Sequence, residues 1–295
     1  MSFAVVTDTS ANLENCHVSE RNIYVVPFSY YVEGKEHTCL DTDGFNCDEY
    51  YAMIKKGVNV TTSQVTPQRY IDCFEPILKS GNDIIFISMS SGISGSCNSA
   101  RIAAREMLEQ YADRKIAVID TRGASLGEGL VALKAADCRD EDLSFEDTLP
   151  ILDNMVQCMC QVFTVDDLMH LRKGGRLSNL SAVVGTVLQI KPILIGNNNG
   201  QIVAIAKIRG RKRSIEELAA RYDRLVADHE NAIIGIAQAG CREDADYLIE
   251  LLNKNKPPKQ IINVQYEPVT GSHVGPGALA LFFVSHDENV RNMDK

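Results

Sequence analysis

The sequence predicts an α/β protein whose first half forms a parallel sheet and whose second half forms a mixed sheet. In the first half, short apolar segments alternate with helix-like segments, and polar or glycine residues directly follow several apolar segments. Such alternation is typical of a parallel sheet that helices cover on both faces, in three layers. The second half contains a hairpin signal, which favours a mixed sheet with helices in two layers.

Each element of the first half follows from a local pattern. Short apolar runs predict strands at 3–7, 24–28, 84–88 and 116–119, the second broken by Pro27. Helices are expected at 48–56, 66–79, 100–111, 126–136 and 144–159, and the polar run 137–142 is expected to be a loop. Pro67 occupies a first-turn position, where its missing N–H costs nothing.

The second half is expected to begin near residue 159. The turn Asn197-Asn198-Asn199-Gly200 predicts a hairpin of 193–195 with 202–208. Further strands are expected at 161–165, 232–238, 260–267 and 281–284, and helices at 180–188, 214–228 and 243–254, with Glu216 in the first turn of the second of these helices. The expected domains are 1–158 and 159–288, with a tail at 289–295.

Composition excludes several classes of function. The chain of 295 residues carries a formal net charge of −9, which argues against general affinity for nucleic acid or anionic membrane. No apolar run approaches the roughly 20 residues that a membrane helix needs, and no secretory signal opens the chain. The 9 cysteines are scattered without a CxxC pair, so free thiols in a reducing cytoplasm and no metal site are expected.

The segment 90–96, Ser-Ser-Gly-Ile-Ser-Gly-Ser, predicts an anion site, because it joins an apolar strand to a helix. Backbone N–H groups and the positive end of the helix dipole favour a negative ligand at such a junction. Ser94 could cap the helix, bind the anion or act as a nucleophile. A hydrolase elbow needs G-x-S-x-G, and Ser96 stands where the second glycine should be.

Other polar segments admit both a structural and a functional interpretation. Segment 61–64 is expected to be a loop whose hydroxyls either cap the next helix or face Ser94. His273, in an expected glycine-rich loop, would be half protonated near neutral pH and could donate to an anion. The basic stretches 173–178 and 207–213 could be solvated or could meet a phosphate. Asp8 and Asp120 end expected strands and could cap the helices that follow.

Taken together, these segments resemble the DegV family of bacterial fatty-acid-binding proteins over nearly the whole chain. The matching segments, in order, are Asp8-Thr9-Ser10, Thr62-Ser63-Gln64, 90–96, 120–129, Lys173-Gly174-Gly175-Arg176 and His273-Val274-Gly275-Pro276-Gly277. Departures from the family pattern are mild, such as Ile93 for leucine, Ser96 for threonine and Val65-Thr66 for the usual Pro-Ser.

The resemblance implies a three-layer α/β/α domain followed by a two-layer α/β domain, with a long-chain fatty acid such as palmitate, stearate or oleate between them. It implies that Thr62, Ser94 and the backbone at Gly95 bind the carboxylate, with His273 nearby. Relatives present the bound acid to a separate kinase that makes acyl phosphate, and Arg176 and Arg209 match positions implicated in that presentation.

The expected function is therefore that of a cytoplasmic lipid carrier without catalytic residues, cofactor or metal. Its expected partners are the fatty acid and the catalytic subunit of a fatty acid kinase. A serine hydrolase or acyltransferase using Ser94 and His273 is the alternative. A third interpretation is a sensor or structural protein for which lipid is only a ligand.

Overall fold

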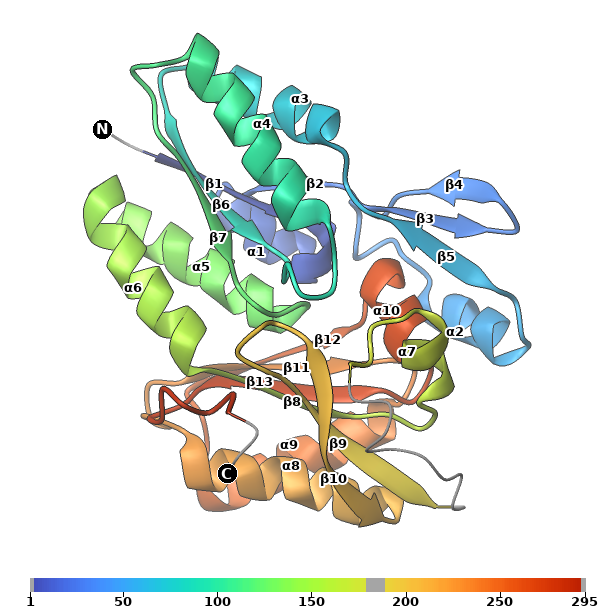
Figure 1. The fold of residues 1–295 in the computed structure, drawn as a ribbon. Helices are drawn as coiled ribbons and strands as arrows, with labels where there is room; N and C mark the ends of the chain where they lie inside the picture. The colour runs from blue at the N-terminus through green and yellow to red at the C-terminus, as the bar shows by residue number, and fades with distance from the viewer. Residues whose placement is uncertain (1–2, 179–188, 293–295) are drawn as a thin grey trace. The chain divides into compact units, whose positions relative to one another are not determined.

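The computed structural model describes residues 3–178 and 189–292 (Figure 1). The chain forms two compact units. The first unit combines Met1–Phe45 with Thr61–Val156, and the second combines Asn46–Val60 with Gln157–Lys295. The expected domains, 1–158 and 159–288, remain a prediction of which parts of the chain fold independently.

The first unit is built on a parallel sheet, as predicted. Its strands are β1 (Phe3–Asp8), β2 (Tyr24–Val26), β6 (Asp83–Ser88) and β7 (Ile116–Asp120), in the order β2-β1-β6-β7. Helices α3 (Pro67–Lys79) and α4 (Ser96–Gln110) cover one face, and α5 (Leu126–Asp140) and α6 (Phe145–Cys158) cover the other (Figure 1). Every residue of β1 and β6 is buried, as strands between two helix layers must be.

Short elements of this unit are missing from the sequence prediction. They are η1 (Thr9–Ala11), α1 (Asn15–Glu20) and a small sheet of β4 (Lys35–His37), β3 (Ser29–Val32) and β5 (Val60–Ser63). The expected strand 24–28 ends at Val26 as β2, before Pro27, and the Phe28 N–H donates to Thr9 Oγ1 at 3.0 Å. Elements of three to six residues carry too little periodicity to be identified from sequence.

The second unit is built on a mixed sheet, also as predicted. Its order is β10-β9-β8-β13-β11-β12, from the strands β8 (Met159–Thr164), β9 (Ile190–Gly196), β10 (Ile202–Arg209), β11 (Ile233–Gln238), β12 (Gln260–Gln265) and β13 (Leu279–Val284). The predicted hairpin is confirmed as antiparallel β9–β10, closed by a turn in which the Asn197 N–H donates to the Gln201 carbonyl. The helices are α2 (Cys47–Lys55), α7 (Met169–Lys173), α8 (Arg211–Leu225), α9 (Arg242–Asn255) and α10 (Pro268–Val274).

The core of the second unit lies between one face of this sheet and helices α8 and α9 (Figure 1). Alternate residues of β13 contribute to it, including Phe283, whose ring meets Tyr222 edge to face at 5.2 Å. Phe282, like Phe163 on β8, therefore points to the opposite sheet face. Both are buried, with 4% and 8% of their surface exposed. Phe283 therefore belongs to the core of the second unit, and Phe163 and Phe282 lie on the other face of the sheet.

Several element boundaries differ from the sequence prediction, among them those of α5 and α8. Helix α5 continues to Asp140, so the expected loop 137–142 is helical at 137–140 and a turn only at 141–142. Charged side chains of the added turn have partners, such as Asp137 with Arg21 at 3.2 Å. Helix α8 begins at Arg211, so Glu216 is not in its first turn. Gly210, with φ of 93°, forms the bend that lets the helix start earlier. The expected helix 180–188 lies outside the described residues.

A tight contact within the second unit suggests a test of how α2 is held there. The Tyr51 hydroxyl donates to the Tyr266 carbonyl at 2.7 Å, and a Cβ built on Gly271 of α10 would lie 2.1 Å from that hydroxyl. Gly271→Ala should lower the free energy of unfolding by about 1–3 kcal/mol, as overpacking does, although alanine is the better helix former. Urea unfolding measures this.

The Tyr51→Phe background is the control for this substitution, because it removes the atom that clashes. There the cost of Gly271→Ala should fall, since the next ring atom, Cζ, lies 3.1 Å from the added Cβ. An equal cost in both backgrounds would contradict the assigned contact.

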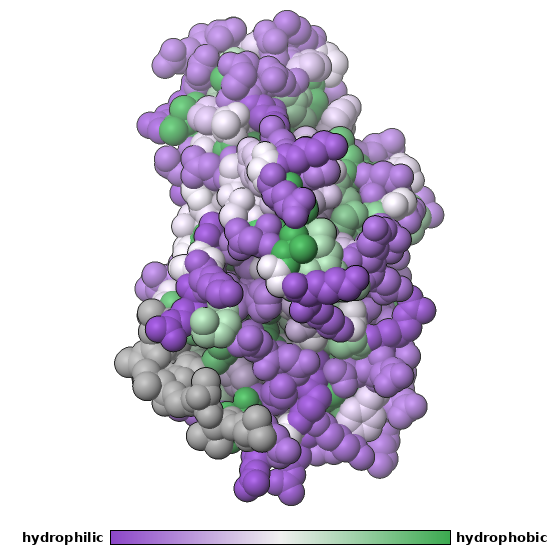
Figure 2. Space-filling model, turned by 90° about the vertical axis from the view of Figure 1, so that its right-hand side faces the viewer, coloured by the Kyte–Doolittle hydropathy of each residue, from purple (hydrophilic) through white to green (hydrophobic). Residues whose placement is uncertain are grey.

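The surface carries few large apolar side chains. On the face in Figure 2, hydrophobic residues form small groups separated by hydrophilic ones. The exposed large hydrophobic residues of the described chain are Tyr24, Leu40, Ile102 and Met169. Within that part of the chain, no helix combines the length and the apolar character needed to cross a bilayer.

Candidate ligand-binding site

The serine-glycine segment forms a tight turn at the start of α4, in the first unit. The N–H groups of Ile93 and Ser94 both donate to the Ser90 carbonyl, and the Ser90 N–H donates to the Gly123 carbonyl at 2.7 Å. Ser91 N–H donates to Asp120 Oδ1 at 3.1 Å. The turn is therefore tied to the segment that follows β7, which fixes it before any ligand arrives.

Ser94 is half-buried and acts on the first turn of the helix. Its hydroxyl accepts from the Ser96 N–H at 3.2 Å and donates to Ser96 Oγ at 2.9 Å. The residue at the N-cap position is Gly95, which has no side chain to offer the helix. Ser94 is therefore not the N-cap of α4 but lies one residue before it, where its hydroxyl accepts from the first N–H of the helix. Gly95 is exposed at the helix start.

The Thr-Ser-Gln segment is a strand and not the loop that the sequence predicted. Thr62 and Ser63 belong to β5, and α3 is capped by Thr66, whose side chain accepts from the Arg69 N–H. The run of β-branched residues Val60-Thr61-Thr62 suits a short strand. The predicted start of the helix is correct to within one residue, but its cap is Thr66 and not a hydroxyl of 61–64.

The two hydroxyl segments of the first unit meet. The Val65 N–H donates to Ser96 Oγ at 3.0 Å, and Gln64 Nε2 lies 3.5 Å from Ser99 Oγ. A Cβ on Gly95 would lie 2.0 Å from Gln64 Oε1, so the glutamine amide rests on the glycine backbone. A larger residue at position 95 would therefore require the Gln64 side chain to move.

His273 differs from the sequence prediction in both position and charge. It lies in the last turn of α10 and not in a loop. Burial, followed by the charge of Arg176, lowers the pKa of His273 to about 4, so the imidazole is neutral at pH 7 and not half protonated. A Cβ on Gly174 would lie 2.5 Å from His273 Nδ1, which places the imidazole over the Lys-Gly-Gly-Arg loop.

The second unit thus brings Arg176 and His273 together. Arg176 is half-buried, which lowers the pKa of its guanidinium, and its Nη1 donates to the Gly174 carbonyl. A guanidinium beside a neutral imidazole offers N–H donors to a carboxylate or phosphate. Thr62, Ser94 and Gly95 belong to the first unit.

The basic stretch 207–213 is divided in its roles. Arg211 is structural, because its Nε donates to Asp244 Oδ2 at 2.8 Å and its Nη2 to the Gly277 carbonyl at 2.7 Å. Arg209, at the end of β10, is exposed, as are Lys207, Lys212 and Arg213. The exposed members remain available to an acidic or phosphorylated partner.

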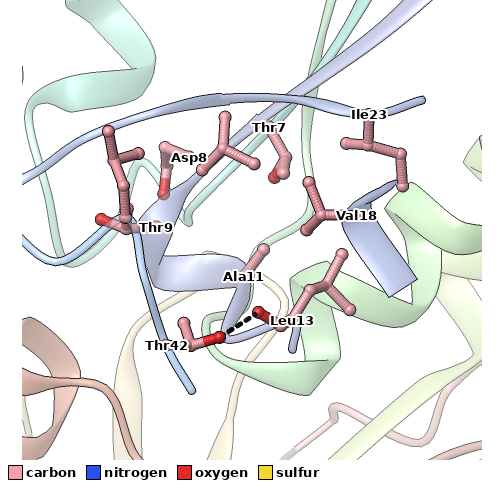
Figure 3. Close-up of a pocket in the computed structure, with 10 residues that line it drawn as sticks. Thr7, Asp8, Thr9, Ala11, Leu13, Val18, Ile23 and Thr42 are labelled. Atoms are coloured by element: carbon pink, nitrogen blue, oxygen red, sulfur yellow. Dashed lines mark hydrogen bonds between the residues drawn. The ribbon is translucent and has the colours of Figure 1, made fainter. Parts of the chain in front are cut away.

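The first unit contains a cavity that no sequence pattern predicts. It has a volume of about 230 Å³ and lies beside the end of β1 (Figure 3). Its walls are mostly apolar, and the lining residues are Thr7, Asp8, Thr9, Ala11, Leu13, Val18, Ile23, Val25, Leu40 and Thr42. The predicted carboxylate ligands Thr62, Ser94 and Gly95 are not among them.

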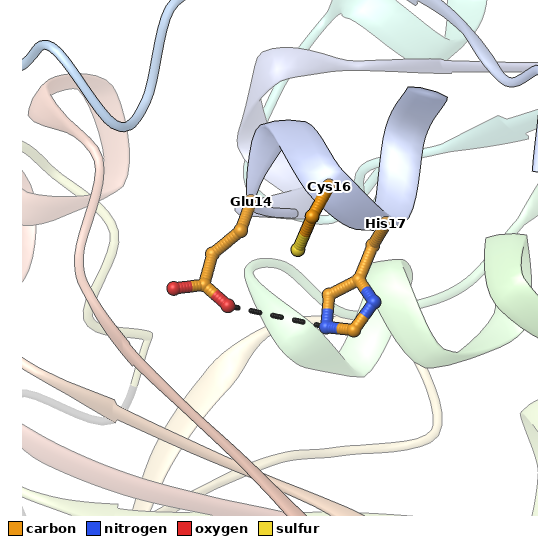
Figure 4. Close-up of side chains that lie close together, drawn as sticks. All are labelled: Glu14, Cys16 and His17. Carbon is orange, nitrogen blue, oxygen red and sulfur yellow. Dashed lines mark ion pairs between the residues drawn. The ribbon is translucent and has the colours of Figure 1, made fainter. Parts of the chain in front are cut away.

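Three side chains at the start of α1 carry metal-binding donor types. The ligand atoms of Glu14, Cys16 and His17 lie within 4.8 Å of one another (Figure 4). Structural zinc sites have four protein ligands, and these three share one surface turn of a six-residue helix. Glu14 and His17 already form a long contact at 3.9 Å, an ion pair when the imidazole is protonated.

Comparison with known proteins agrees with the fold and with the ordered motifs. The family model described as uncharacterised proteins of the DegV family matches residues 2–286. A DegV domain-containing protein of Clostridium perfringens is 34% identical over 282 residues, which cover 96% of this chain and 97% of the relative.

Solved structures with the same fold include two described as fatty acid binding. A DegV family protein from Thermus thermophilus has a TM-score of 0.88 and 25% identity, covering 97% of this chain and 100% of that one. DegV from Bacillus subtilis has a TM-score of 0.81 and 30% identity, covering 97% and 99%. The chain belongs to the DegV family.

Proposed function

We propose that this protein binds a long-chain fatty acid and presents its carboxylate to a partner kinase that forms acyl phosphate. The observation that carries the proposal is the fixed turn at Ser94, which offers a hydroxyl and an accessible helix start beside the strand that carries Thr62. The fatty acid ligands of the related DegV proteins support the lipid class.

The energetics of a long acyl chain fit binding without a covalent bond. Each buried methylene contributes about 0.8 kcal/mol, so roughly 14 of them give about 11 kcal/mol before the costs of association. An ionised carboxylate is costly to remove from water unless donors replace the water. Thr62, Ser94 and the Gly95 N–H are proposed as those donors, with His273 as a neutral N–H donor. That the acyl chain lies between the two domains remains a prediction.

The hydrolase alternative is weakened by the chemistry of both proposed catalytic groups. Ser94 Oγ donates to Ser96 Oγ, and a general base works best with a pKa near the operating pH. The low pKa of His273, about 4, makes it a weak base at neutral pH. Both residues are better suited to hydrogen bonding with a ligand than to activating a nucleophile.

Native mass spectrometry of the purified protein tests the proposal. A non-covalent adduct that releases a long-chain fatty acid on denaturation is the expected result. A covalent adduct of a fluorophosphonate probe on Ser94 would instead support the hydrolase. Finding neither, even after incubation with palmitic, stearic and oleic acid, would reject lipid carriage.

Presentation to a kinase gives a second expected outcome. Arg209→Ala should leave palmitic acid affinity unchanged and lower acyl phosphate formation by about tenfold or more, because an exposed arginine at an interface often contributes more than 1 kcal/mol. The measurement is a reconstituted assay with the fatty acid kinase catalytic subunit.

Arg105→Ala, which removes an exposed arginine from α4, is the control for charge and should not change turnover. Equal turnover of Arg209→Ala and wild type would exclude Arg209 from the kinase interface. Failure of every kinase tested to use the loaded protein would favour a sensor role.

A further inference from the structure

Two buried carboxyl groups meet in the first unit, away from the residues proposed to bind the ligand. Asp8 ends β1 and Glu128 lies in the first turn of α5, and both are completely buried. The Ser10 hydroxyl connects them, since it contacts Asp8 Oδ1 closely and lies 2.7 Å from Glu128 Oε2. On its other side, Glu128 Oε1 lies 2.9 Å from Thr7 Oγ1.

Counting protons shows that two ionised carboxylates do not fit this arrangement. Thr7 Oγ1 also lies 3.1 Å from the Ile87 carbonyl, so the two hydroxyls take part in four close oxygen–oxygen contacts. Each hydroxyl has one proton to donate. With both acids ionised, two of these contacts would join oxygens that have no proton between them. One further proton on a carboxyl leaves only one such contact.

The surrounding donors assign that proton to Glu128. Asp8 accepts from the Ser10 N–H at 2.9 Å, and the backbone of Met89 also favours its ionised form. The Glu128 oxygens lie against the Thr7 and Ser10 hydroxyls, which can accept from a neutral acid, and against the Asp8 carboxyl, whose charge disfavours a second negative charge on Glu128. The consistent chain runs from a neutral Glu128, which donates to Ser10, to Ser10, which donates to the Asp8 carboxylate.

This network joins α5 to the turn that follows β1. The Ser125 N–H donates to the Ser10 carbonyl at 2.8 Å, directly beside the hydroxyl contact. The same turn, through Asp8 and Thr9, forms part of the wall of the cavity (Figure 3). A group that fixes Ser10 therefore also fixes the shape of that wall.

We propose that Asp8 and Glu128 share a single proton, held on Glu128, and that this neutral acid positions the Asp8-Thr9-Ser10 turn against α5. Glu128 is a positioning residue, since it acts on the cavity wall through Ser10. The pair makes the first unit sensitive to pH.

The direction of the pH dependence follows from the pKa values. Burial raises the pKa of Asp8 from 3.8 to about 6, and burial with repulsion from Asp8 raises the pKa of Glu128 well above 4.5. Both groups bind protons more tightly when folded, so their contribution to stability is complete at low pH. It is lost as the pH rises through the folded pKa values of the two groups.

The other titratable side chains whose pKa responds to the pair are Tyr70 on α3 and Cys97 on α4. Burial raises the pKa of Tyr70 well above 10 and also raises the pKa of Cys97. Neither group carries a compensating positive charge. The proton on Glu128 is therefore what limits the charge of this buried site.

The first test is infrared spectroscopy of the wild-type protein, which does not depend on a variant that folds. We expect the carbonyl stretch of a protonated carboxylic acid to be present at pH 7 and to disappear at high pH. Complete absence of that band at pH 7 would overturn the proposal.

The second test compares Glu128→Gln, which keeps a donor but cannot ionise, with Glu128→Ala and the exposed control Glu109→Gln. Between about pH 6 and pH 9 the urea midpoint of wild type should fall, that of Glu128→Gln should fall less, and that of Glu109→Gln should follow wild type. Glu128→Ala should have a lower midpoint than Glu128→Gln at pH 7. If the urea midpoint of Glu128→Gln were lower than that of wild type by the same amount at every pH, Glu128 would act as an ionised carboxylate, and the proposal would be overturned.

Discussion

Ser94→Ala should weaken palmitic acid binding by about ten- to a hundredfold, because it removes one hydrogen bond to a charged group, typically about 1.5–3 kcal/mol. The fold should survive. Stability should fall by only about 1 kcal/mol, as on loss of a helix cap, since Ser94 Oγ also accepts from the Ser96 N–H. Titration calorimetry measures the affinity, and urea unfolding the stability.

Ser91→Ala is the matched control, because Ser91 lies in the same turn and is exposed. Its side chain is not proposed to touch the carboxylate, so palmitic acid affinity should match wild type. Equal affinities of Ser94→Ala, Ser91→Ala and wild type would contradict the proposed role of Ser94. Equal loss in both alanine variants would show that the turn as a whole matters and not the one hydroxyl.

Gly129→Ala is expected to cost the most stability. A Cβ on Gly129 would lie 2.5 Å from the Ala11 carbonyl oxygen and 3.0 Å from Leu13 Cδ2, and the backbone atom cannot rotate away. Helix α5 would have to move from η1, at a cost of about 1–3 kcal/mol or more. The free energy of unfolding from urea titration measures the effect.

The sign of the Gly129 effect decides between two interpretations. If Gly129 were an ordinary helix residue with space around it, replacing it by alanine would raise the free energy of unfolding by up to about 1 kcal/mol. A stabilised Gly129→Ala variant would therefore contradict the close approach of α5 and η1. A loss would confirm that the first turn of α5, with Glu128, is fixed by that approach.

Features set by neighbours in the sequence were predicted well. The buried strands β1 and β6, the β9–β10 hairpin and the turn at Ser94 all follow from apolar runs, Asn-Gly turns and a strand-to-helix junction. The DegV fold followed from the order of its motifs. Short elements such as β5 and α10 were not predicted, because their hydroxyl and glycine residues are typical of loops.

Features set by distant residues could not be predicted. The grouping of Asn46–Val60 with the second unit depends on contacts such as Tyr51 with Tyr266. The low pKa of His273 depends on burial and on Arg176, which is remote in sequence. The prediction that Asp8 caps the helix that follows is confirmed for η1. Its contact with Glu128 through Ser10 could not be predicted, because the two carboxyl groups are far apart in the sequence.

A crystal structure of the protein with bound palmitic acid tests the central claim most directly. We expect one carboxylate oxygen within hydrogen-bond distance, about 2.5–3.2 Å, of Ser94 Oγ, and Thr62 Oγ1 within the same range of the carboxylate. A palmitic acid whose carboxylate contacts neither hydroxyl would contradict the account.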